Sequence, residues 1–194
     1  MVMDFALEHS PALCLLSGRA HYEQVVTAVL EAELSVWIAT ANLKELLVED
    51  WRVAPRSRRR AVGNGYCSVL ERFDELASKG VELRILHASL PSRPFRESFD
   101  RHTALVGGAL ELRMCARVHL KTVIIDGRLL YLGSANWTGA GLGVKGRTRR
   151  NFELGILSRD ELLLDQVQAL YQHIWQGAAC ADCGLRGSCE APIR

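Results

Sequence analysis

The chain has 194 residues, enough for one well-packed domain and too few for two domains of ordinary size. With 48% hydrophobic and 24% charged residues, its composition excludes a disordered or fibrous chain. The net charge is only +2, but 20 of the 24 basic residues are arginine, and half of the 24 fall in segments 52–60, 93–101 and 145–150. Because the guanidinium fork matches phosphate oxygens, this clustering favours an anionic substrate over a merely solvated surface.

No stretch of the sequence reaches the ~20 apolar residues that a membrane-spanning helix needs. The short apolar run at 12–17 follows Asp4 and Glu8, which makes it a poor signal peptide. We therefore expect a cytoplasmic protein. Its six cysteines are then expected to be thiols or metal ligands rather than disulfides.

The first half of the chain predicts alternating strands and helices. Apolar residues at helical spacing predict helices at 20–33 and 66–79, and the N-cap residue Asn42 predicts a short helix at 42–49. Apolar and β-branched runs predict strands at 13–16, 34–40 and 81–87.

Residues 51–65 predict a basic loop, because Pro55 and two glycines oppose regular structure. It is either a solvated loop or a substrate contact, and the candidate binding residues are Arg56, Arg58, Arg59 and Arg60.

The second half predicts several strands in succession, framed by helices. A proline-containing turn at 90–103 leads into a short helix, and strands follow at 109–115, 118–126, 129–134 and 152–157. A tight turn at Asp126-Gly127 joins two of them. Ser158 and Glu161 predict a capping box for a final helix whose apolar face is Leu163, Val167, Leu170 and Ile174. This order predicts an α/β fold, a mixed β-sheet flanked by helices, in one domain over 1–176 with a cysteine-rich tail at 177–194.

Three pairs of polar residues, each two positions apart, stand on three of these predicted strands. The pairs are His119 and Lys121, Ser134 and Asn136, and Asn151 and Glu153. Because side chains alternate along a strand, each pair points to one face. A nucleophile, a phosphate anchor and several hydrogen-bonding groups can therefore meet over one patch of sheet.

The spacing H-x-K, four residues, Asp, six residues, G-S-x-N resembles the HKD motif of the phospholipase D superfamily. The matching residues are His119, Lys121, Asp126, Gly133, Ser134 and Asn136. Asn151 and Glu153 resemble that superfamily's supporting Asn/Glu pair. A short, arginine-rich chain with one motif resembles the small bacterial endonucleases of the superfamily, and the resemblance implies a phospholipase D-like sandwich.

The resemblance implies a histidine that attacks phosphorus to form a phosphohistidine, while a second histidine protonates the leaving alcohol. Lys121 and Asn136 would hold the non-bridging oxygens, Ser134 would add a hydrogen bond, and Glu153 would orient a histidine. No metal is needed for this chemistry. By strand parity Asp126 points away from His119, so we interpret it as structural.

The sequence holds only one half of such a site, because no other histidine has a lysine two residues later. The simplest completion is a homodimer that brings two copies of His119 together across a two-fold axis.

Arg147, Arg149 and Arg150 adjoin the motif and favour nucleic acid as the substrate, so a nuclease acting on DNA or RNA is preferred. The alternatives are a phospholipase D or transphosphatidylase acting on phospholipid headgroups, and a non-catalytic nucleic-acid-binding module.

The tail predicts a structural zinc site, because three thiolates and an imidazole make a complete tetrahedral set. The candidate ligands are Cys180, Cys183, Cys189 and His173. An iron–sulfur cluster is the alternative, with Cys14, Cys67, Cys115 or a partner chain as the fourth ligand. Free reduced cysteines remain a third possibility.

Overall fold

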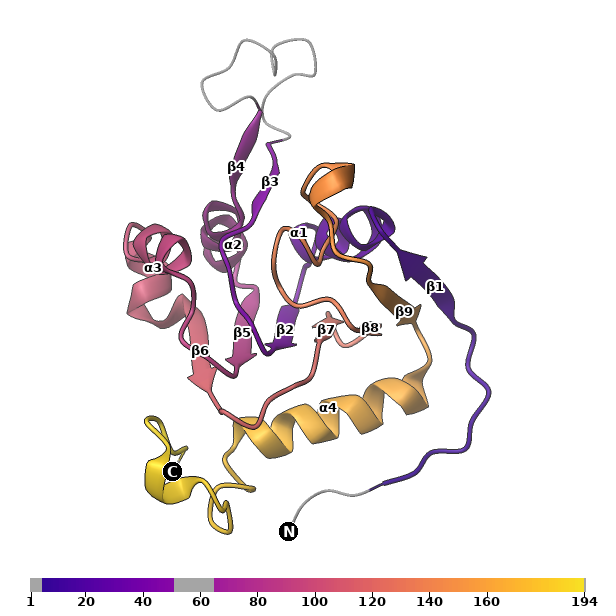
Figure 1. Cartoon of the computed structure of the whole chain (residues 1–194), viewed down its shortest axis with the longest axis vertical. Helices are drawn as coiled ribbons and strands as arrows, with labels where there is room; N and C mark the ends of the chain where they lie inside the picture. Colours follow the sequence, from indigo (N-terminus) through magenta and orange to yellow (C-terminus); the bar gives the residue numbers. More distant parts are fainter. Residues whose placement is uncertain (1–4, 51–64, 194) are drawn as a thin grey trace.

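A seven-stranded mixed sheet forms the centre of the computed structural model, which describes residues 5–50 and 65–193 (Figure 1). The strand order is β1-β9-β8-β7-β2-β5-β6. The strands are β1 (Cys14–Ser17), β2 (Ser35–Thr40), β5 (Glu82–His87), β6 (Leu110–Met114), β7 (Thr122–Ile125), β8 (Leu129–Gly133) and β9 (Leu154–Ser158). β2, β5 and β6 are parallel and the other neighbours antiparallel, which confirms the predicted mixed α/β fold. β3 (Leu47–Glu49) and β4 (Tyr66–Ser68) form a separate two-stranded hairpin.

Helices cover both faces of the sheet (Figure 1). One face packs against η1 (His21–Val26), α1 (Thr27–Leu30), α2 (Val69–Ser78), α3 (Arg93–Phe99) and η2 (Leu105–Ala109). The other packs against α4 (Glu161–Trp175). Two short turns of 3₁₀-helix complete the described elements, η3 (Arg147–Arg149) and η4 (Arg186–Ser188). None of the helices within 5–50 and 65–193 combines the length and hydrophobicity needed to cross a membrane.

Strand periodicity explains how one sheet serves two cores. Ile38, Ile85 and Val123 face the core that contains α1 and α2, whereas their neighbours Ala39, Leu86 and Ile124 face the core under α4. The predicted strands are confirmed to within a few residues because this alternation is explicit in the sequence.

The helix predicted to start at Asn42 is wrong, and the segment is extended up to β3. Its backbone groups bond to other parts of the chain instead of to one another. The Lys44 N–H donates to the Trp137 carbonyl at 3.0 Å, and the Leu46 carbonyl accepts from the Val69 N–H at 2.8 Å. These tertiary hydrogen bonds override a local preference for helix, which is worth only a few tenths of a kcal/mol per residue.

Two helix starts also differ from the sequence prediction. The helix predicted from Tyr66 begins at Val69, because Tyr66–Ser68 pairs with β3 and the Ser68 hydroxyl caps the Leu70 N–H. The capping box of Ser158 and Glu161 is wrong: the N-cap of α4 is Asp160, whose carboxylate accepts from the Leu163 N–H at 2.9 Å.

The buried face of α4 is rotated from the predicted one. Its buried residues are Leu164, Val167, Tyr171 and Trp175. Tyr171 stacks on Trp37 of β2 with ring centroids 5.3 Å apart, and Trp175 stacks on Tyr171 at 5.8 Å. Large aromatic surfaces set the helix orientation because they bury more apolar area than the leucines expected there.

The Asp126-Gly127 turn is confirmed, and it shows why an aspartate is needed. Both residues have positive φ, 53° and 61°, as a type I′ turn requires. The Asp126 carboxylate accepts backbone N–H groups of Glu33, Leu34 and Ser35 at 2.7–3.1 Å. Asp126 therefore ties the β7–β8 turn to the start of β2, in agreement with a structural role.

We expect Asp126→Ala to lower the free energy of unfolding by about 2–4 kcal/mol. The variant leaves three backbone N–H groups without an acceptor, and it places alanine at a positive φ that aspartate tolerates better. Asp126→Asn, which keeps one acceptor oxygen, should cost about 1 kcal/mol. Urea denaturation measures both variants. Equal stability of Asp126→Ala and the natural chain would contradict this role.

Candidate functional site

His119 and Lys121 lie in the extended segment just before β7 rather than within a strand. The Gly133 N–H donates to the Lys121 carbonyl at 3.1 Å, which fixes the segment beside the end of β8. The Lys121 ammonium donates to the His119 carbonyl at 2.8 Å and lies 3.1 Å from each imidazole nitrogen. The His119 side chain is exposed. The imidazole and the ammonium thus form one unit that faces solvent.

Ser134, Asn151 and Glu153 form a second unit where β8 ends and β9 begins. The Glu153 carboxylate accepts hydrogen bonds from the Ser134 hydroxyl and, at 3.0 Å, from the Asn151 amide. The Leu154 N–H donates to the Ser134 hydroxyl at 3.1 Å. The serine, the amide and the carboxylate therefore hold one another in place.

Electrostatics connect the two units. Burial lowers the pKa of Lys121, and the nearby Glu153 carboxylate partly offsets this by favouring the charged ammonium. Within the single chain, however, the hydrogen bonds of Glu153 go to Ser134 and Asn151, so its predicted contact with a histidine is not made there.

Asn136 is oriented by the end of β2. Its carboxamide oxygen accepts the backbone N–H groups of Ala41 and Asn42, each at 3.1 Å, and is 3.3 Å from the Thr40 hydroxyl. The Thr40 hydroxyl also accepts the Trp137 N–H at 2.9 Å. Because these donors occupy the oxygen, the Asn136 NH₂ group remains for a substrate oxygen. The sequence carries no signal for Thr40, because a threonine at the end of a strand is ordinary.

Two glycines allow this arrangement to close. Gly133 pairs with Gly155 across β8 and β9, and a Cβ on either would lie 2.3 Å from the side chain of Tyr131. Burial raises the pKa of Tyr131 to about 12, so its ring packs there as a neutral group. The structure thus gives Gly133 a packing role, and Tyr131 is a supporting residue that the motif alone does not reveal.

The other five histidines do not supply a second catalytic group within the chain. The described hydrogen bonds of His9, His21 and His87 go to Asp160, the Gly18 carbonyl and the Ser89 carbonyl. His102 lies 3.7 Å from Asp74, and the Nε2 atom of His173 is buried without a partner. The described chain therefore presents one histidine at the motif.

A family model of the PLD-like domain of cardiolipin synthase matches residues 59–175, more than half of the 194 residues. The chain belongs to this PLD-like family. A mitochondrial cardiolipin hydrolase from Chlamydomonas reinhardtii is 31% identical over 101 residues, which cover 52% of this chain and 43% of that protein. The chain therefore matches less than half the length of that relative.

Solved structures share the fold. NucT from Helicobacter pylori has a TM-score of 0.58 at 16% identity, covering 86% of this chain and 96% of that chain. Nuc from Salmonella typhimurium, a phospholipase D family member, has a TM-score of 0.57 at 17% identity, covering 86% and 95%. A phosphatidylserine synthase from Haemophilus influenzae Rd KW20 has a TM-score of 0.53 at 17% identity, covering 85% and 38%. The PLD-like fold predicted from the motif is confirmed, as is the likeness to small members of the superfamily.

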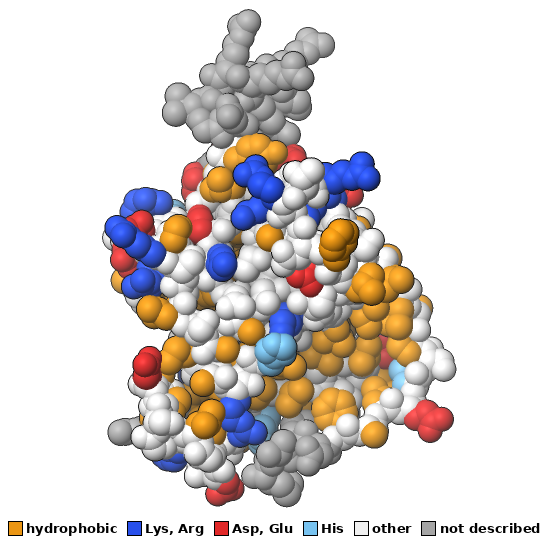
Figure 2. All heavy atoms as spheres, viewed as in Figure 1, with side chains coloured by type: hydrophobic (Ala, Val, Ile, Leu, Met, Phe, Trp, Pro, Cys, Tyr) orange, Lys and Arg blue, Asp and Glu red, His pale blue; other side chains and the backbone are white. Residues whose placement is uncertain are grey.

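The predicted arginines divide into two groups. Arg56, Arg58, Arg59 and Arg60 lie outside the described residues. Arg147 and Arg149 are exposed in η3, and the Arg150 guanidinium donates to the Lys145 carbonyl at 2.6 Å. Figure 2 shows basic side chains on the upper part of the viewed face, around this loop of the PLD-like domain.

The predicted tail metal site is not assembled. Across residues 5–50 and 65–193, no group of three His, Cys, Asp or Glu residues is arranged to hold a metal ion. The reason is that the ligands divide between two hollows. Cys180 and Cys183 line both, but Cys189 lines one and His173 the other. Cys115, just after β6 and one of the residues considered as a fourth ligand of an iron–sulfur cluster, lines both hollows as well.

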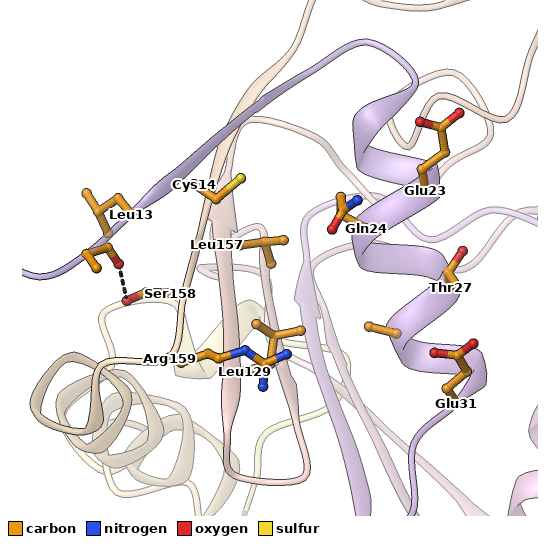
Figure 3. Close-up of a pocket in the computed structure, with 12 residues that line it drawn as sticks. Leu13, Cys14, Glu23, Gln24, Thr27, Glu31, Leu129, Leu157, Ser158 and Arg159 are labelled. Carbon is orange, nitrogen blue, oxygen red and sulfur yellow. Dashed lines mark hydrogen bonds between the residues drawn. The ribbon is translucent and has the colours of Figure 1, made fainter.

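A further hollow of about 580 Å³ lies at the opposite end of β9 from the motif (Figure 3). Glu23 of η1, Glu31 just after α1, Cys14 of β1 and Arg159 just after β9 are among the residues that line it. No motif residue lines this hollow, so its size alone does not make it the site of the PLD-like domain.

The Lys121 ammonium should titrate below the ordinary lysine range, and Glu153→Gln should lower its pKa further, because the variant removes the negative charge that favours the ammonium. NMR titration of ¹³C-lysine-labelled protein measures this, and the signal missing from Lys121→Arg assigns the resonance among the 4 lysines. An unchanged or raised Lys121 pKa in Glu153→Gln would contradict the link between the two units.

Proposed function

We propose that the chain is a phosphodiester hydrolase, acting most readily on DNA or RNA, that forms a phosphohistidine at His119. One observation carries the proposal. An exposed imidazole and its adjacent ammonium stand beside a serine–carboxylate–amide unit at the same strand ends. These groups supply what phosphoryl transfer needs, a nucleophile and donors for the charge that develops on the phosphate oxygens.

In this mechanism the His119 imidazole attacks phosphorus, a nitrogen–phosphorus bond forms, and the bond to the leaving oxygen breaks. Lys121 and the Asn136 NH₂ group donate to the non-bridging oxygens. A second imidazole, from the partner's His119, gives its proton to the leaving alkoxide and then takes a proton from water. The resulting hydroxide attacks phosphorus, which breaks the nitrogen–phosphorus bond and restores His119.

Nucleic acid is the preferred substrate because the site adjoins a basic surface. Arg147 and Arg149 are exposed a few residues before Asn151, and Arg150 is held against the same loop. Exposed guanidinium groups suit a polyanionic backbone and give salt-dependent affinity. NucT and Nuc, which have the same fold over nearly their whole length, support the comparison with small single-unit members.

The proposal includes a homodimer, because the chain presents one histidine where the mechanism uses two. An apolar area borders the site: Leu15 and Leu154, 71% and 60% exposed, share one face of the sheet with Ile156, which pairs with Leu15. The Leu154 N–H bonds to Ser134, so this area reaches the motif. Figure 2 shows hydrophobic side chains gathered where β8, β9 and α4 lie. Such an area suits a second copy that would complete the site.

A phospholipid hydrolase is the second candidate. The same apolar area beside the motif could receive acyl chains, and the matching family model and the curated relative carry cardiolipin in their names. Release of a phosphatidyl product from cardiolipin vesicles, without cleavage of DNA or RNA, would favour this function over a nuclease.

We expect His119→Ala to reduce cleavage of a fluorescent oligonucleotide by about a thousandfold or more, because no other group can form the covalent intermediate. Cleavage by the natural chain should persist in EDTA. The control is His9→Ala, which removes a histidine that bonds to Asp160 outside the motif. Turnover by His119→Ala at the natural rate would exclude the mechanism. Binding without turnover by the natural chain would indicate a non-catalytic module.

Mixing the natural chain with His119→Ala under subunit exchange tests whether two histidines share one site. A shared site needs both, so an equal mixture should retain about a quarter of the activity. Independent subunits would retain about half.

We expect Leu15→Asp to shift the protein from dimer to monomer in sedimentation velocity and to reduce cleavage in parallel, because a carboxylate on the apolar area opposes burial. Leu90→Asp is the matched control, since Leu90 is 67% exposed outside this area. A folded Leu15→Asp dimer with full activity would place the interface elsewhere.

A further inference from the structure

A groove of about 630 Å³ leads away from the motif. Its walls are the extended segment after β2, the start of α3 and the glycine-rich loop after β8. Asn136 and Asn151 are among its lining residues, and both also belong to the candidate site. A substrate whose phosphate lies at the motif can therefore extend directly into this groove.

Backbone hydrogen bonds fix the walls of the groove relative to the motif. Leu43 pairs with Trp137, one residue after Asn136, and the Lys44 N–H donates to the Trp137 carbonyl at 3.0 Å. The opposite wall is fixed where the Asn151 N–H donates to the Ala140 carbonyl at 3.1 Å. The segment that was expected to be helical is thus a groove wall, and its extended form is what brings Lys44 to the lining.

The groove carries positive charge on both walls. Lys44 lines one wall and Lys145 the other; both are exposed, and neither has a carboxylate partner within residues 5–50 and 65–193. Glu45 is the one acidic residue among the described lining, but its carboxylate accepts from the Ser68 hydroxyl. Burial raises the pKa of Glu45, and the hydrogen bond from the Ser68 hydroxyl partly offsets this. Two ammonium groups and one carboxylate give the described lining a net positive charge.

We propose that this groove binds the single-stranded segment of nucleic acid that adjoins the scissile phosphate, with Lys44 and Lys145 pairing with phosphates on that side. This inference rests on the proposed phosphodiesterase function and specifies that the nucleic-acid substrate is single-stranded. A basic groove that tracks the backbone is the usual means of holding single strands. The Asn42 amide and the Ser92 and Thr138 hydroxyls also line the groove, where they can bond to sugar and base edges. A duplex, whose bases are paired inside, fits a walled groove less well.

The test compares Lys44→Ala/Lys145→Ala with Lys79→Ala, which removes an exposed lysine at the end of α2, outside the groove. Each protein is assayed on a single-stranded oligonucleotide and on bis(p-nitrophenyl) phosphate, a diester too short to extend from the motif along the groove. In the double variant, the ratio of kcat/KM for the oligonucleotide to that for the small diester should fall about tenfold. The slope of log(kcat/KM) against log[salt] should become shallower by about 1.4, since each lost phosphate contact on a single strand contributes about 0.7.

The outcomes separate this inference from the function on which it rests. If the natural chain cleaves neither diester, the proposed function fails. If it cleaves both and the double variant keeps the ratio and salt slope of Lys79→Ala, the groove assignment fails. Equal competition by duplex and single-stranded DNA would overturn the strand preference. A loss confined to cardiolipin vesicles would assign the groove to a lipid headgroup instead.

Discussion

The pairing of Gly133 with Gly155 is the constraint on which the site depends. It places the end of β8 against the start of β9, so that Ser134, Asn151 and Glu153 meet although Asn151 comes 17 positions after Ser134 in the sequence. The pairing requires glycine on both strands, because the Tyr131 side chain occupies the space of any Cβ. A buried aromatic residue thus controls the geometry of polar groups on the surface.

A second set of backbone contacts positions Asn136 and the segment that follows β2. The Asn136 oxygen accepts N–H groups from the end of β2, and Trp137 bonds to both Thr40 and Lys44. These bonds orient one substrate donor and keep the following segment extended. The same contacts that position Asn136 therefore form the groove beside it. Site and groove form a continuous surface, which is consistent with a substrate larger than one phosphate.

Part of the site was predictable from local spacing. His119 with Lys121, and Asn151 with Glu153, are each two residues apart in extended chain, and the structure brings each pair together as expected. The position of these pairs just outside the strands was not predictable, because strand ends depend on partner strands. The predicted metal site in the tail was wrong for a related reason. α4 fixes the position of His173 and the tail fixes that of Cys189, and spacing in the sequence does not determine how these two residues approach each other.

The sequence by itself determined the strands, the turn at Asp126-Gly127, the family and the residues of the motif, because these follow from alternation, from residues that tolerate positive φ and from fixed spacing. Only the tertiary structure decided that residues 42–46 are extended, that α4 turns its aromatic face inward, and that Thr40 and Tyr131 support the site. Each of these depends on contacts between distant segments, whose free energies exceed the small local preferences that a sequence displays.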